Sequence, residues 1–80
     1  MLFESVRTET IHVELLNEGT PVWRPVSALQ VGPRTFVVLR TRSYDPKDEE
    51  WEFPPGSIVV CRKEVRDGKD VLVAISHADI

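Results

Sequence analysis

An Asp-Gly pair at residues 67–68 constrains the fold of this chain more than any other feature of the sequence. The pair lies between Val65 and Val71 and is flanked on each side by a run of strand-forming residues. Asp-Gly favours a two-residue hairpin loop, because both loop positions need a positive φ angle. The C-terminal part of the chain is therefore predicted to be a β-hairpin.

The rest of the chain shows the same arrangement of short strands and turns. Residues 10–16 alternate apolar and polar types, so we expect Ile11, Val13 and Leu15 to face the core. Pro25 cannot donate a backbone hydrogen bond to a sheet and therefore marks an edge position or a bulge. The predicted strands cover residues 10–16, 22–31, 35–41, 51–53, 57–63 and 71–75, and residues 76–80 are predicted to be a tail or a single helical turn.

These strands follow one another without a crossover helix, which favours antiparallel pairing. A chain of 80 residues is long enough for one domain only. Closing the sheet on itself also protects the strand edges from aggregation. The sequence therefore predicts an all-β fold, a small antiparallel barrel of about five strands that forms a single domain over residues 1–80.

Composition and apolar run length argue against a membrane-spanning or secreted protein. The longest apolar runs, such as residues 36–39, are far shorter than the stretch of about 18 residues that spans a bilayer. Residues 1–7 lack the basic and apolar regions of a secretory signal. The single cysteine, Cys61, agrees with a reducing compartment. We therefore expect a cytoplasmic protein with no membrane contact.

No group of residues has the spacing of a catalytic or metal site. His12 and His77 have no cysteine or acid at ligand spacing, whereas structural zinc needs about four ligands. Cys61 lies within a predicted strand, where we expect a buried thiol and not a nucleophile. The acids between residues 48 and 52 lie on a loop that does not hold two carboxylates at a fixed separation. We predict a protein that is not an enzyme, with no catalytic residue, metal or cofactor.

Negative charge is concentrated in one segment. The net charge is −3, and five of the 13 acidic residues lie between Asp45 and Glu52. Mutual repulsion is expected to extend this part of the long connection, residues 42–50, into solvent as a mobile loop. Its field repels a phosphate backbone and attracts a basic group. Nucleic acid is therefore disfavoured as a partner, and a protein with a basic segment is favoured.

Aromatic and arginine side chains cluster in sequence around the acidic segment. Trp, Tyr and Arg are over-represented at the centres of protein interfaces. Burial in the core is the alternative for the rings, favoured for Trp51 and Phe53 and left open for Trp23. The candidate partner-binding residues are Trp23, Arg24, Tyr44, Asp48, Glu49, Glu50 and Trp51.

Two segments, Gly19–Val26 and Glu49–Cys61, resemble a group of short bacterial proteins of unknown function. In that group a Gly-Thr-x-Val-Trp-Arg-Pro-Val stretch precedes a Glu-Trp-Glu-Phe-x-x-Gly segment. The strand order also resembles SH3-like barrels, in which an aromatic and acidic loop is followed by Pro-Gly and a strand. This resemblance implies a fold and not an activity, because small barrels have many unrelated functions. The Ala-Leu-Tyr-Asp-Tyr motif of peptide-binding SH3 domains is absent, so the resemblance does not extend to proline-rich peptides.

The sequence favours a protein-interaction or accessory module that uses an aromatic and acidic surface patch. Two alternatives remain open, an inhibitor or immunity-type protein and a small nucleic-acid-binding or ribosome-associated barrel. The edge that carries Pro25 is compatible with a monomer or a weak dimer. The nucleic-acid alternative would use Arg24, Arg34, Arg40, Arg42 and Arg62.

Overall fold

The computed structural model describes residues 8–42 and 44–78, which form strands, turns and loops. Residues 1–7, 43 and 79–80 lie outside the described residues. The expectations from the sequence for the N-terminus and for the end of the tail fall on these residues. The described part of the chain contains no helix long and apolar enough to cross a membrane. The strands are β1 (Thr8–Leu16), β2 (Val22–Gly32), β3 (Thr35–Val38), β4 (Glu50–Trp51), β5 (Ile58–Arg66) and β6 (Lys69–His77).

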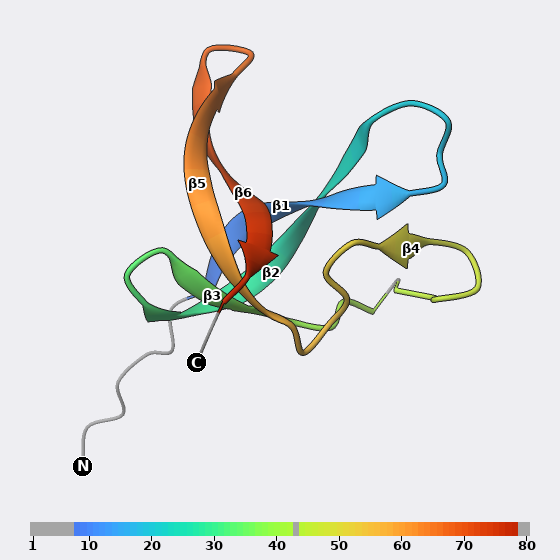
Figure 1. The fold of residues 1–80 in the computed structure, drawn as a ribbon, viewed down its shortest axis with the longest axis horizontal. Helices are drawn as coiled ribbons and strands as arrows, with labels where there is room; N and C mark the ends of the chain where they lie inside the picture. Colours follow the sequence, from blue (N-terminus) through green and yellow to red (C-terminus); the bar gives the residue numbers. More distant parts are fainter. Residues whose placement is uncertain (1–7, 43, 79–80) are drawn as a thin grey trace.

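Five of the six strands close into a ring (Figure 1). Neighbours pair in the order β1, β2, β3, β5, β6 and back to β1, and β4 adds to the end of β1. The closing β1–β6 pairing is parallel and the other pairings in the ring are antiparallel. A ring with an odd number of strands requires this, because five neighbours cannot all alternate in direction. The predicted all-β fold of about five strands is confirmed, and the parallel closure is new.

The core lies inside this ring. Alternation along β1 buries Ile11, Val13 and Leu15 on one side, as predicted from the sequence. Trp51 and Phe53 are 4% and 3% exposed, which confirms the prediction that both rings pack in the core. Each fully buried large apolar side chain contributes about 1.5–3 kcal/mol to folding. The core consists of Ile11, Val13, Leu15, Val26, Ala28, Phe36, Val38, Trp51, Phe53, Val59, Cys61 and Ala74.

Positive φ angles lie at the turns that the sequence marks. Asp67 and Gly68 have φ angles of 52° and 75°, and the residues that flank them pair directly across β5 and β6. This is the two-residue loop that an Asp-Gly pair favours. Asn17 has a φ angle of 62° in the turn between β1 and β2, and Gly56 one of 93° at the corner before β5. The predicted hairpins and the predicted corner are confirmed.

A β-bulge in β6 changes how its last residues pack. The β5–β6 register shifts between Val60 and Cys61, where one step along β5 matches two steps along β6. Ile75 is therefore the extra residue, and the side-chain alternation reverses after it. His77 consequently packs against Phe53, with ring centroids 4.9 Å apart. The prediction of a tail after Ile75 is wrong, because pairing with β5 continues β6 to His77.

Pro25 occupies the edge position predicted for it. Its stretch of β2 pairs with β1, whereas the pairing of β2 with β3 begins at Ala28. The bulge in β2 lies instead at Val31, which is the extra residue between two successive residue pairs of β2 with β3. β3 is shorter than the predicted strand 35–41 and ends at Val38. Past that point, the Leu39 N–H still donates to Ser27 on β2 at 3.0 Å.

Cys61 is a core residue. Its side chain is 1% exposed, and burial raises the pKa of its thiol to about 11. A thiol is unreactive when little of it ionises, because the thiolate is the nucleophile. The prediction of a buried thiol is confirmed.

The φ angle at Gly68 gives a test of the hairpin loop. Gly68→Ala should lower the free energy of unfolding by about 1–2 kcal/mol, because a residue with a Cβ is strained in the left-handed region. Nothing lies within 4 Å of the added Cβ, so the loss would report strain and not a clash. Urea denaturation followed by tryptophan fluorescence measures it. The control is Gly32→Ala, which lacks a positive φ and brings the new Cβ only to 3.6 Å from Thr35. Equal losses in both variants would contradict the argument.

Cys61 gives a second test. Because its pKa is about 11 in the folded protein and ordinarily 9.0, the unfolded chain loses its thiol proton first. Stability is therefore lost as the pH rises from 9.0 toward 11. Urea midpoints measured across this range should fall more steeply for the wild type than for Cys61→Ala. In the folded protein at about pH 8, a thiol reagent should modify Cys61 only after urea is added. Rapid modification without urea would contradict burial.

Candidate functional site

The acidic segment is docked on the end of the β1–β2 hairpin. β4 pairs with the end of β1, and the Glu52 N–H donates to the carbonyl of Glu14 at 2.9 Å. The Asp45 carbonyl accepts N–H groups of Asp48 and Glu49 at 2.9 and 3.0 Å. The expectation that repulsion extends this segment into solvent is wrong, because these backbone bonds curl it into a turn.

Glu49 joins several predicted site residues. The Trp51 Nε1–H donates to Glu49 Oε1 at 2.9 Å, and the Arg24 Nε–H donates to the same oxygen at 3.2 Å. Arg24 also pairs with Oε2 of Glu49 through its Nη2 group. The Tyr44 ring packs edge-on against Trp51, with centroids 4.6 Å apart. Two residues of the predicted patch, Arg24 and Trp51, thus bind the carboxylate of a third, Glu49, and Tyr44 packs behind Trp51.

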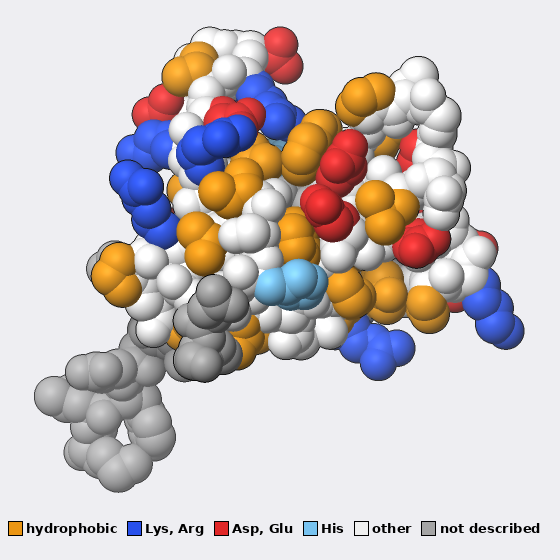
Figure 2. All heavy atoms as spheres, in the orientation of Figure 1, with side chains coloured by type: hydrophobic (Ala, Val, Ile, Leu, Met, Phe, Trp, Pro, Cys, Tyr) orange, Lys and Arg blue, Asp and Glu red, His pale blue; other side chains and the backbone are white. Residues whose placement is uncertain are grey.

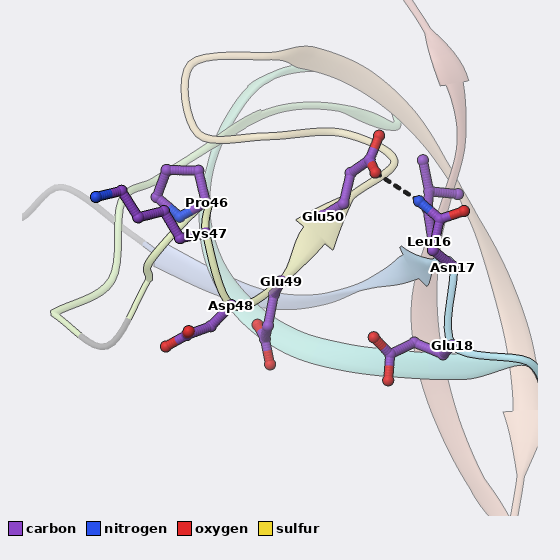
Figure 3. A pocket seen from close by; sticks show the side chains of 8 residues that line it. All are labelled: Leu16, Asn17, Glu18, Pro46, Lys47, Asp48, Glu49 and Glu50. Atoms are coloured by element: carbon purple, nitrogen blue, oxygen red, sulfur yellow. Dashed lines mark hydrogen bonds between the residues drawn. The ribbon is translucent and has the colours of Figure 1, made fainter.

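A hollow of about 230 Å³ lies between the β1–β2 turn and the acidic segment (Figure 3). The Asn17 Nδ2–H donates to Glu50 Oε1 at 2.6 Å and links its two sides. Glu18 and Asp48 have no ion-pair partner among the residues that the structure describes. We call this feature the acidic hollow. It is lined by Leu16, Asn17, Glu18, Pro46, Lys47, Asp48, Glu49 and Glu50.

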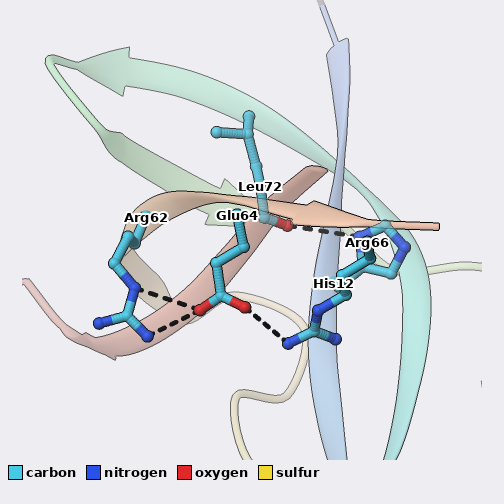
Figure 4. A network of polar contacts seen from close by, with 5 residues as sticks. All are labelled: His12, Arg62, Glu64, Arg66 and Leu72. Atoms are coloured by element: carbon cyan, nitrogen blue, oxygen red, sulfur yellow. Dashed lines mark hydrogen bonds and ion pairs between the residues drawn. The ribbon is translucent and has the colours of Figure 1, made fainter. Parts of the chain in front are cut away.

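Trp23, on β2, belongs to a different cluster, whose charged members lie on the β5–β6 hairpin. It is half-buried, and the guanidinium of Arg66 lies 4.6 Å from its ring centroid, a cation–π contact. Glu64 accepts hydrogen bonds from Arg62 at 2.7 and 3.1 Å and from Arg66 at 2.9 Å (Figure 4). Hydrogen bonds from Arg62, which have the larger effect, and from Arg66 lower the pKa of Glu64. We call Trp23, Arg62, Glu64 and Arg66 the arginine cluster.

The two clusters differ in charge. Figure 2 shows Lys and Arg side chains gathered over the β5–β6 hairpin, with several Asp and Glu side chains toward β4. Of the five arginines in the nucleic-acid alternative, Arg24 and Arg62 pair with glutamates. Arg34 lies in the β2–β3 turn with a φ angle of 57°, and Arg40 and Arg42 are exposed. Two of these five arginines are therefore already paired with carboxylates of the chain.

The structure adds residues that the sequence analysis missed. Asn17 and Glu18 contribute to the acidic hollow, and Arg66 covers Trp23. The only sequence signal for Glu18 is its place in a turn, which does not show what the turn faces. Within residues 8–42 and 44–78, no group of three or more His, Cys, Asp or Glu side chains could hold a metal ion. His12 instead places Nδ1 at 3.4 Å from the carbonyl of Leu72.

Comparison with known proteins returned no match: no family model, curated protein or solved structure shows significant similarity to the chain. The resemblance to short bacterial proteins and to SH3-like barrels therefore stays a prediction from the sequence.

Proposed function

We propose that this protein is a non-catalytic protein-interaction module that binds a basic segment of a partner protein at the acidic hollow. One observation carries the proposal. The carboxylates of Glu18 and Asp48 come from segments far apart in the sequence, line the same hollow, and have no cation paired with them in the described chain. A lysine or arginine of a partner would supply the missing charge.

The walls of the acidic hollow suit such a side chain. Leu16 and Pro46 provide apolar surface for the methylene stem of a lysine or arginine. The Asn17–Glu50 hydrogen bond and the β1–β4 pairing hold the two sides in place before binding. A site arranged in advance loses less conformational entropy on association. The same negative field disfavours a nucleic-acid backbone at this surface.

A fluorescent oligo-arginine peptide, titrated by anisotropy at low and raised salt, tests the proposal. The wild type should bind in a salt-sensitive manner. The double variant Glu18→Gln/Asp48→Asn should bind about 2- to 30-fold more weakly, because exposed charge pairs contribute about 0.2–1 kcal/mol each and two are lost.

The matched control is Glu9→Gln/Asp70→Asn, which removes the same charge at exposed positions that do not line the acidic hollow. An equal loss in the control would show that only net charge matters and would overturn the site. If an RNA oligonucleotide bound the protein and the peptide did not, the result would favour the nucleic-acid alternative.

A further inference from the structure

One of the chain's own guanidinium groups is paired with a carboxylate of a residue that lines the acidic hollow. Glu49 lines the hollow, and Arg24 reaches both of its carboxylate oxygens through Nε and Nη2. This two-pronged arrangement is the geometry in which arginine recognises a carboxylate. Arg24 thus occupies the position on Glu49 that a partner's arginine would take.

The two partners of Glu49 differ in how easily they can be replaced. The indole of Trp51 is fixed, because its ring lies in the core with the residue 4% exposed. The Arg24 side chain is 47% exposed, and the Glu49 side chain is 22% exposed. Arg24 also lies on the part of β2 that pairs with β1 only. Exchanging one guanidinium for another on Glu49 keeps the same kind of contact, and solvent reaches the Arg24 side of the pair, so the exchange costs little.

We propose that Arg24 is an internal competitor, which occupies Glu49 in the free protein and gives way to an arginine of the partner. This inference rests on the proposed function and concerns the regulation of the same site. It makes Glu49 a third binding carboxylate, available only after Arg24 is released. If Arg24 were instead a strut that holds the acidic segment in place, its loss would weaken binding. The two roles therefore predict changes in affinity of opposite sign.

The variant Arg24→Gln separates these roles. We expect it to bind the oligo-arginine peptide about two- to fivefold more tightly than the wild type, the range that loss of an exposed ion pair allows. Lys63→Gln removes the same charge at an exposed position on β5 and controls for net charge. In a Glu49→Gln background, which keeps an acceptor oxygen for Trp51, Arg24→Gln should give no gain. Unchanged or weaker binding by Arg24→Gln, or an equal gain in Lys63→Gln, would overturn the inference.

Nuclear magnetic resonance on the unmodified protein gives an independent readout. On saturation with the peptide, the Arg24 Nε–H signal should shift and exchange faster with water, whereas the Trp51 indole N–H should stay protected. An Arg24 signal unchanged at saturation would overturn the inference. Peptide binding that depends on Glu18 and Asp48 without a gain in Arg24→Gln would overturn the internal competitor and leave the proposed function standing. Absence of binding by the wild type and by Arg24→Gln would overturn both.

Discussion

The parallel pairing of β1 with β6 is the contact on which the closed core depends. It joins Ile11 to Leu72 and His12 to Val73, and the His12 ring adds a contact to the Leu72 carbonyl at 3.4 Å. Without this seam the other strands would form an open antiparallel sheet with two exposed edges. With it, the side chains of Ile11 and its neighbours on β1 face an enclosed interior. A short seam therefore determines whether the buried side chains share one core.

The seam also sets where the candidate site lies. β6 covers the middle of β1, which leaves the end of β1 free to pair with β4. That pairing brings the acidic segment against the β1–β2 turn and inserts Trp51 into the core. Because the indole of Trp51 donates to Glu49, core packing fixes the position of a carboxylate on the surface. The geometry of the acidic hollow thus follows from the closure of the ring.

Local signals in the sequence predict much of the fold, and they stop where a contact has no local signature. Asp67-Gly68 and the alternation in β1 predict the hairpins and the inward face, since backbone angle and burial both depend on adjacent residues. The parallel seam consists of two residue pairs with no distinctive pattern. The bulge at Ile75 inserts a residue that looks like any other strand residue. The partner of Glu50 in the hydrogen bond across the acidic hollow lies 33 residues away, a separation that no local pattern reveals.

The division of the predicted patch into two clusters has a simple geometric origin. Trp23 and Arg24 are consecutive on β2, and consecutive residues of a strand point to opposite faces. Adjacency in the sequence suggests one surface for the pair, but Arg24 reaches Glu49 while Trp23 lies under Arg66. One strand segment therefore contributes to the acidic hollow on one side and to the arginine cluster on the other. Arginine in each cluster pairs with a glutamate of the chain, whereas the carboxylates of Glu18 and Asp48 in the acidic hollow have no cation paired with them among the described residues.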